Sequence, residues 1–227
     1  MRALFWISMA LVVYTYAGYP LVLLLLGRRR SPAVAPSELA PRVTVVIAAR
    51  NEADKIRRKI EHTLALDYPA DRLEILVASD ASDDGTDAIV EEYADRRVRL
   101  VRAPQRNGKE HAQSLAIAVA RGDVLVFTDA ATLLEPLALR SLVRNFDDPT
   151  VGAVSTEDCL VDAAGNPTGE GLYVKYEMLV RRLESRFHSL VGLSGSCFAM
   201  RRALCQPWPT HLARSRPANS RFPVVSE

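Results

Sequence analysis

Residues 42–80 read RVTVVIAARNEADKIRRKIEHTLALDYPADRLEILVASD, and the hydrophobic period of this stretch changes twice. The opening run RVTVVIAA is almost continuously apolar, which is typical of a strand buried on both faces of a sheet. The next segment places Ile56, Ile60 and Thr63 at helical spacing, and LEILVAS then returns to a strand pattern. The stretch therefore predicts a strand, a helix and a second strand.

The same alternation continues to residue 130. The segments TDAIVEEYA (86–94) and KEHAQSLAIAVA (109–120) read as helices, whereas RVRLVRA (97–103) and DVLVFTDA (123–130) read as strands. The predicted order is β-α-β-α-β-α-β, which places the chain in the α/β class. Such an order indicates a mostly parallel sheet flanked by helices on both faces, and sheets of this kind bind ligands at the carboxyl ends of their strands.

A long apolar segment precedes this domain. Residues 3–26, ALFWISMALVVYTYAGYPLVLLLL, contain no ionisable group other than tyrosine. At about 1.5 Å per residue the segment spans roughly 36 Å, which exceeds a bilayer core of about 30 Å. We therefore expect residues 1–27 to form one transmembrane helix, in which lipid surroundings tolerate Pro20. A buried core helix is one alternative, and a cleaved signal peptide is another, although the latter needs a shorter apolar region.

The charges beside this segment predict its orientation. Arg28, Arg29 and Arg30 outweigh Arg2 and the amino terminus, so the positive-inside rule places the remainder of the chain in the cytoplasm of a single-pass protein at the cell membrane. The basic, proline-containing residues 28–41 read as a short stiff linker. Membrane lipid is thus an expected partner.

Overall composition excludes some classes of protein. A formal net charge of +2 leaves no electrostatic footprint for nucleic acid, so no nucleic-acid partner is expected. The cysteines Cys159, Cys197 and Cys205 show no paired metal-ligand spacing and fit reduced cytoplasmic thiols.

Polar and acidic side chains follow the predicted strands. Because the carboxyl ends of parallel strands meet at one edge, these residues form an acidic rim there. A dinucleotide fingerprint is absent, and the Gly-Lys pair at 108–109 lacks the rest of a phosphate-loop motif. An acidic rim favours hydrogen bonds to bases and sugars and a hard divalent cation that holds phosphate. The rim consists of Asn51, Glu52, Asp80, Asp83, Asp84 and Asp129.

Four segments resemble the family 2 glycosyltransferases, which are membrane-bound processive and lipid-linked sugar transferases with a GT-A catalytic domain. They are VTVVIAARNEADKI, LVASDASDDGTDAI, NGKEHAQSLAIAVARGDVLVFTDAAT and SGSCFAMRRAL, in the order and spacing of the family. The resemblance covers residues 42–206 and implies an incomplete GT-A domain preceded by one transmembrane helix. It also implies a nucleotide-sugar donor, commonly a UDP-sugar, and a saccharide or lipid acceptor.

The resemblance implies roles for four nucleotide-sugar-binding residues. Asp80 matches the aspartate that accepts hydrogen bonds from the nucleotide base, and a carboxylate suits N–H donors because it only accepts. Asn51 and Glu52 match the pair near the ribose and base, and Lys109 matches a lysine near the phosphates.

Simpler roles compete with these assignments. Glu52 could complement the dipole of the following helix, and Lys109 could be a solvated lysine at a helix start. For Asp83 and Asp84 we expect turn and capping chemistry at the start of the next helix rather than ligand contact.

Asp129 matches the first acid of the metal-binding motif of the family. The resemblance implies that Mg²⁺ or Mn²⁺ there bridges the two phosphates of the donor and absorbs charge on the departing nucleoside diphosphate. The second acid of that motif is replaced by Ala131, so Asp129, phosphate oxygens and water would hold the ion. Magnesium commonly keeps several waters, which makes a site with one carboxylate reasonable.

The carboxyl-terminal region departs from the family. There the segment after FAMRRAL leads to an acidic segment with the catalytic base, whereas residues 207–227 contain four prolines and read as an irregular or disordered tail. The TED triplet at 156–158 precedes SGSCFAMRR and is interpreted as a coincidence. The catalytic base is thus expected to be missing and the activity impaired by truncation.

Two functions follow from the sequence. The first is a membrane-anchored inverting glycosyltransferase that moves a sugar from a nucleotide-sugar to an acceptor hydroxyl. The alternative is a non-catalytic membrane-anchored protein that binds nucleotides or partners.

Overall fold

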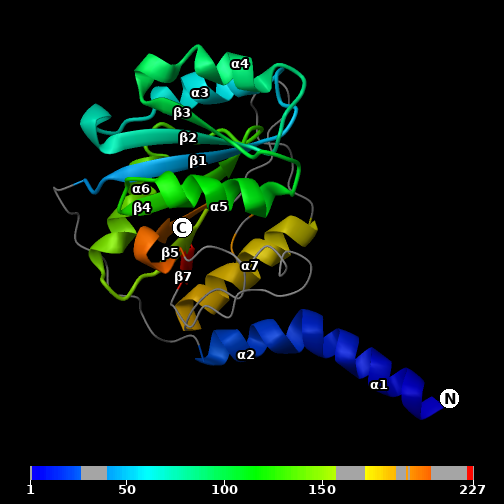
Figure 1. Cartoon of the computed structure of the whole chain (residues 1–227). Helices are drawn as coiled ribbons and strands as arrows, with labels where there is room; N and C mark the ends of the chain where they lie inside the picture. Colours follow the sequence, from blue (N-terminus) through cyan, green and yellow to red (C-terminus); the bar gives the residue numbers. More distant parts are fainter. Residues whose placement is uncertain are drawn as a thin grey trace.

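The computed structural model describes residues 2–26, 40–156, 172–187, 193, 195–205 and 224–226. Within these residues a seven-stranded sheet has the order β3-β2-β1-β4-β6-β5-β7 (Figure 1). The strands are β1 (Val43–Ala49), β2 (Leu73–Ser79), β3 (Val98–Arg102), β4 (Val124–Asp129), β5 (Ala153–Ser155), β6 (Cys197–Arg201) and β7 (Val224–Ser226). The domain helices are α3 (Ile56–Leu64), α4 (Thr86–Glu91), α5 (Lys109–Val119), α6 (Ala138–Arg144) and α7 (Leu172–Phe187).

The first four strands are parallel, as the alternating pattern predicts. β1 pairs with β2 on one side and with β4 on the other, and β2 pairs with β3. The carboxyl ends of β2, β1 and β4 therefore lie next to one another. β6 is antiparallel to both β4 and β5, so the complete sheet is mixed.

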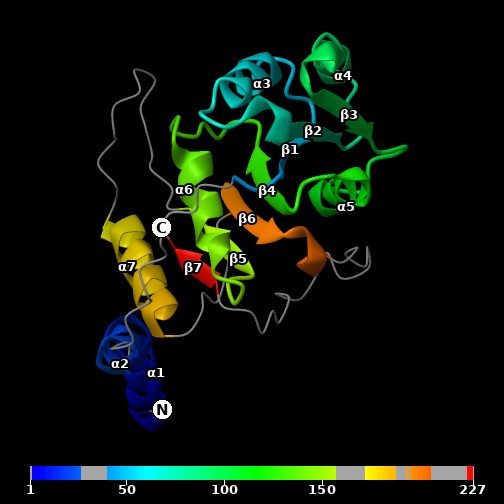
Figure 2. The same ribbon diagram turned by 90° about the vertical axis from the view of Figure 1, so that its left-hand side faces the viewer.

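Alternate side chains of the central strands pack into two hydrophobic layers. Val45 and Ile47 belong to the layer that includes α3, α4 and α6, whereas Val46 belongs to the layer that includes α5. Helices thus cover both faces of the sheet (Figure 2), as expected for an α/β domain. Phe127 of β4 stacks on Phe198 of β6 with ring centroids 4.8 Å apart, which joins the parallel and antiparallel parts.

Strand β7 lies in the region for which the sequence predicted an irregular tail. Its three residues pair in parallel with β5 at one edge of the sheet. Two adjacent valines suit such an edge, since β-branched residues favour strands. The rest of that tail, Cys159 and the linker arginines Arg28–Arg30 lie outside the described residues.

The apolar amino-terminal segment is helical from residue 2 to residue 26. It consists of α1 (Arg2–Val13), a π-helical turn (Tyr14–Gly18) and α2 (Tyr19–Leu26). Pro20 explains the turn, because its ring nitrogen has no hydrogen to donate to the preceding turn of the helix. Tyr19 N–H instead donates to Tyr14 O, five residues earlier.

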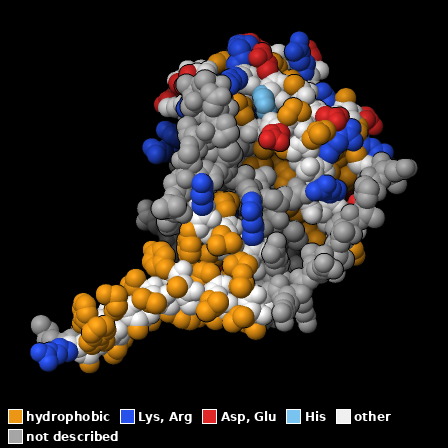
Figure 3. Space-filling view, turned by 180° about the vertical axis from the view of Figure 1, so that it is seen from behind, with side chains coloured by type: hydrophobic (Ala, Val, Ile, Leu, Met, Phe, Trp, Pro, Cys, Tyr) orange, Lys and Arg blue, Asp and Glu red, His pale blue; other side chains and the backbone are white. Residues whose placement is uncertain are grey.

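This helix is the one described helix that is long and apolar enough to cross a membrane. Only 6% of its most apolar 18-residue stretch is buried, whereas the core helix of a domain is mostly buried. Figure 3 shows its exposed apolar side chains extending away from the charged surface of the domain.

Polar contacts join the amino-terminal helix to α7. The Tyr19 hydroxyl donates a hydrogen bond of 2.6 Å to Glu184 Oε1, and the Tyr176 hydroxyl donates one of 3.2 Å to Thr15 O. Leu23 is the buried residue of α2, and α2 lies against α7 (Figure 1). The carboxyl-terminal half of the apolar helix is therefore attached to the domain.

Candidate active site

The candidate site lies at the carboxyl ends of β1, β2 and β4. Asp80 follows β2 directly, and Asp129 is the last residue of β4. Ala49 pairs with Ser79 and Ala48 pairs with Asp129, so both aspartates flank the end of β1. The topology thus brings together the two acids on which the sequence interpretation depends.

The Asp80 carboxylate is buried and accepts hydrogen bonds from the loop before α5. Asp80 is only 4% exposed. Its Oδ1 accepts from Asn107 N at 2.9 Å and from Gly108 N at 3.1 Å, and its Oδ2 accepts from Gly108 N at 3.1 Å. Gly108 has a φ of 96°, a conformation that glycine adopts readily. The carboxylate therefore fixes the start of α5, a role that the sequence did not indicate.

Lys109 and Asp129 form an ion pair at the same end of α5. Lys109 Nζ lies 2.6 Å from Asp129 Oδ1 and 3.4 Å from Gly195 O. The two side chains are 43% and 40% exposed, so a ligand in solvent can reach both. Because Asp80 holds residue 108 and residue 109 holds Asp129, the start of α5 connects the two aspartates.

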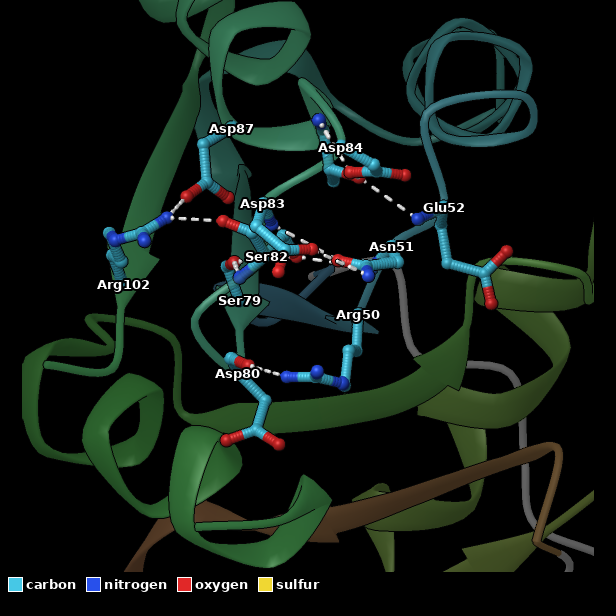
Figure 4. A network of polar contacts seen from close by, with 11 residues as sticks. Arg50, Asn51, Glu52, Ser79, Asp80, Ser82, Asp83, Asp84, Asp87 and Arg102 are labelled. Atoms are coloured by element: carbon cyan, nitrogen blue, oxygen red, sulfur yellow. Dashed lines mark hydrogen bonds and ion pairs between the residues drawn. The ribbon is translucent and has the colours of Figure 1, made fainter. Parts of the chain in front are cut away.

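Asn51 connects the loops that follow β1 and β2. Its side-chain amide donates to Asp83 Oδ1 at 2.7 Å, and its Oδ1 accepts from Asp83 N at 3.1 Å (Figure 4). Asn51 has a φ of 51°, which asparagine tolerates better than most residues. Asp83 thus pairs with Asn51 instead of capping α4.

Asp84 has the turn role predicted for it. Its Oδ1 accepts hydrogen bonds from Thr86 N at 3.0 Å and from the Thr86 hydroxyl at 2.5 Å, and its Oδ2 accepts one from Ala53 N at 3.0 Å. These hydrogen bonds lower the pKa of the Asp84 carboxyl, and the bond from the Thr86 hydroxyl has the largest effect. The aspartate cluster therefore holds two loops together and begins α4.

The Glu52 carboxylate points away from the Asn51–Asp83 contact (Figure 4). It forms an ion pair of 2.9 Å with Lys55, and the Glu52 carbonyl accepts from Lys55 N and Ile56 N. In this structure Glu52 therefore makes the contacts of a residue at a helix start.

Two basic residues near the site were missed by the sequence analysis. Arg50 donates a hydrogen bond of 2.9 Å from a guanidinium nitrogen to the Asp80 carbonyl (Figure 4). Lys59 is 1% exposed, and its Nζ donates to Thr128 Oγ1 at 3.0 Å and to Thr132 O at 2.5 Å. Burial lowers the pKa of Lys59 to about 8. The sequence did contain a signal for Lys59, since it lies three residues after Ile56 and four before Thr63, which are both buried in α3.

The residues around Asp129 fit a divalent cation held by one protein carboxylate. Among the described residues no group of three or more His, Cys, Asp or Glu side chains could hold a metal. Ala131 is exposed at the position of the second acid. Asp129 Oδ1 binds Lys109, and Oδ2 has no hydrogen-bond partner in the described part of the chain. Such a donor set suits Mg²⁺ or Mn²⁺ that keeps phosphate and water ligands.

A hollow of about 500 Å³ lies at the opposite edge of the sheet, near the amino ends of β1, β2 and β3. Its arginines are mostly engaged within the protein: Arg97 donates to Ala70 O, and Arg99 forms an ion pair with Glu74. Ligands of α/β sheets collect at the other edge. The acidic rim is therefore the better candidate site. Five arginines line the hollow: Arg42, Arg72, Arg97, Arg99 and Arg121.

The comparison with known families identifies the domain. Residues 44–207 match the family described as Glycosyl transferase family 2. The chain belongs to this family, and its mostly parallel sheet with flanking helices is the GT-A architecture predicted from the sequence.

Curated relatives include the probable glycosyltransferase YdaM of Bacillus subtilis, which is 29% identical over 73% of this chain and 42% of its own length. Beta-monoglucosyldiacylglycerol synthase of Synechocystis is 28% identical over 71% of this chain and 36% of its own length. Hyaluronan synthase of Streptococcus pyogenes is 35% identical over 50% of this chain and 29% of its own length. The chain thus spans less than half the length of these relatives.

Solved structures show the same fold. The mannosyltransferase PcManGT from Pyrobaculum calidifontis, in complex with GDP-Man and Mn²⁺, is 32% identical with a TM-score of 0.72. The match covers 90% of this chain and 59% of that one. TarS of Staphylococcus aureus in complex with UDP is 18% identical with a TM-score of 0.59 and covers 77% of this chain and 52% of that one, which supports the fold alone.

Proposed function

We propose that this chain binds a nucleoside-diphosphate sugar along the acidic rim and belongs to an inverting glycosyltransferase. The observation that carries the proposal is the exposed Lys109–Asp129 pair at the start of α5, beside the buried Asp80. It supplies one cation and one carboxylate to a diphosphate at the strand ends where α/β sheets bind ligands. The similarity to PcManGT, whose structure contains GDP-Man and Mn²⁺, supports the same assignment.

Lys109 and Asp129 would separate when the donor binds. The Lys109 ammonium would neutralise phosphate oxygens, and Asp129 would become a ligand of Mg²⁺ or Mn²⁺. When bound, the cation stabilises negative charge on the departing diphosphate. Both side chains are more than a third exposed, so their exchange of partners requires no opening of the core.

The base and ribose would lie toward β1 and β2. Asn51, Glu52 and Asp80 remain the proposed contacts there. Three amide contacts already occupy much of the Asp80 carboxylate, which accepts about four hydrogen bonds at most. Its contribution would therefore depend on the position of the loop before α5.

The proposed transfer proceeds with inversion at the anomeric carbon. The oxygen of the acceptor hydroxyl forms a bond to that carbon as the bond from the carbon to the phosphate oxygen breaks. The nucleoside diphosphate leaves with the electron pair, and the hydroxyl proton passes to a base. We assign no such base among the described residues. General-base help is typically worth about 10² to 10⁴ in rate.

Two nucleobases are candidates for the donor nucleotide, uracil and guanine. The sequence interpretation favours a UDP-sugar, whereas the similar structure at 32% identity contains GDP-Man. The acceptor is proposed to be a saccharide or a lipid, since relatives include beta-monoglucosyldiacylglycerol synthase and hyaluronan synthase.

We also propose that the apolar helix anchors the protein to the cell membrane as a single span, with the domain on the cytoplasmic side. Its apolar side chains are exposed along α1 and most of α2. Exposed surface of this kind is stabilised by lipid rather than by water.

Sugar transfer from radiolabelled donors tests the proposed function. Membranes containing the full chain would be incubated with UDP-glucose, UDP-N-acetylglucosamine or GDP-mannose, with Mn²⁺, and label in lipid and polymer fractions would be counted. Metal-dependent incorporation from one donor is expected. Donor binding without incorporation would favour the non-catalytic alternative, and absence of both would contradict the proposal.

A further inference from the structure

Lys59 is a buried cation that contacts the turn containing Asp129. It extends from α3, and its Nζ donates to two neutral oxygens, Thr128 Oγ1 at 3.0 Å and Thr132 O at 2.5 Å. In the described part of the chain no carboxylate forms an ion pair with this ammonium group. A buried charge whose direct partners are neutral oxygens is costly, and an apolar residue would satisfy the packing of α3 at a lower cost.

The two acceptors of Lys59 lie on either side of Asp129. Thr128 precedes Asp129 in β4, and the Thr132 amide donates back to the Asp129 carbonyl at 3.3 Å. Asp129 N in turn donates to Ser196 O at 3.4 Å. One ammonium group therefore holds both ends of the turn from which the Asp129 carboxylate projects into solvent.

The ammonium group of Lys59 lies on the buried side of the turn at residues 128–132. Cys197 and then Asp129 interact electrostatically with Lys59, whereas Lys109 contacts the exposed side of Asp129. Because burial excludes water from Lys59, its field is screened less than that of an exposed lysine. A diphosphate bound at Asp129 would thus experience the field of a buried cation as well as that of the exposed Lys109.

We propose that Lys59 is a positioning residue for the diphosphate of the donor. Its ammonium group fixes the turn at residues 128–132 so that Asp129 is presented to a metal-bound diphosphate, and at neutral pH it adds a positive charge on the buried side of that turn. This inference rests on the proposed function, and it explains how one carboxylate can suffice where Ala131 replaces a second acid.

The test compares Lys59→Met with a control variant at another buried position of α3. Methionine keeps the length and the apolar stem of lysine but removes its charge and its donors. The control is Ile60→Val, because Ile60 is also fully buried but belongs to the hydrophobic layer. The full chain in detergent would be titrated with UDP and with GDP, with and without Mn²⁺, and its Tm would be measured at pH 7.

We expect Lys59→Met to weaken Mn²⁺-dependent binding of the nucleoside diphosphate at least tenfold while its Tm falls no further than that of Ile60→Val. Ile60→Val should bind within twofold of the wild type. A merely structural lysine would produce the reverse, a lower Tm with unchanged affinity, and that result would overturn the proposal.

A second variant covers the case in which Lys59→Met does not fold. Thr128→Val removes one acceptor of the ammonium group at nearly constant volume, and a loss of affinity smaller than that of Lys59→Met, about threefold, is expected. Unchanged affinity in Thr128→Val would then count against the proposal. If the wild-type chain binds neither nucleotide, the proposed function fails first and the role of Lys59 fails with it.

Discussion

At the scale of single residues, the buried Lys59 makes stability depend on pH. Its folded-state pKa of about 8 lies below the ordinary 10.5, because burial disfavours the charged form. Between these values the unfolded chain binds more protons than the folded chain, so wild-type stability rises with pH relative to Lys59→Met. The slope of that difference is at most about 1.4 kcal/mol per pH unit.

Chemical denaturation of the wild type and of Lys59→Met at pH values from 7 to 10 measures the difference in their free energies of unfolding. This difference should be nearly constant below pH 8 and should grow in favour of the wild type above pH 8. A difference that shrinks above pH 8 would show that the ammonium form is favoured in the folded protein.

The structure leaves no room for a side chain at Gly122. A Cβ at this position would lie 2.4 Å from Thr44 N and 2.7 Å from Val43 C, both backbone atoms of β1. We expect Gly122→Ala to lower the free energy of unfolding by about 1–3 kcal/mol, because β1 has to shift. Gly195→Ala is the control, since nothing lies within 4 Å of its Cβ position. Equal Tm values for the two variants would contradict this.

The residue scale also shows where prediction from the sequence stops. Asp80 and Asp129 were found because polar residues after apolar strands share one edge. The partners of Asp80 were not predicted, because the amides of Asn107 and Gly108 reach it only through the path of the loop before α5. Lys59 was missed because a lysine at helical spacing is ordinarily solvated.

At the scale of elements, the contact between β4 and β6 joins the parallel and antiparallel parts of the sheet. Phe127 is 1% exposed, whereas its stacking partner Phe198 is only partly buried. Phe127→Ala should cost about 3–5 kcal/mol, and Phe198→Ala should cost less. A double-mutant cycle by chemical denaturation would isolate a coupling of about 0.5–1.5 kcal/mol. A larger loss for Phe198→Ala than for Phe127→Ala would refute this ranking.

The periodicity of the sequence predicted the elements from β1 to β4 because each is long enough to show a period. β5 and β7 have three residues each, which is too short for a period. Their pairing brings Val154 next to Val225, a contact between distant segments that no local pattern indicates.

At the scale of the whole molecule, the amino-terminal helix and the domain form one attached unit through α7. We expect the full chain to remain with membranes after alkaline carbonate extraction, because the apolar side chains of α1 are all exposed to the surroundings. A variant lacking residues 2–26 should shift to the soluble fraction. Release of the full chain by carbonate would contradict the anchor.

The most direct test of the central proposal is calorimetric binding of UDP and GDP to the full chain, with and without Mn²⁺. Asp129→Asn is compared with Asp67→Asn, whose carboxylate pairs with Arg140 away from the rim. The proposal predicts Mn²⁺-dependent binding of one nucleotide that Asp67→Asn retains and Asp129→Asn loses by at least tenfold. Equal binding by both variants would contradict a diphosphate site at Asp129.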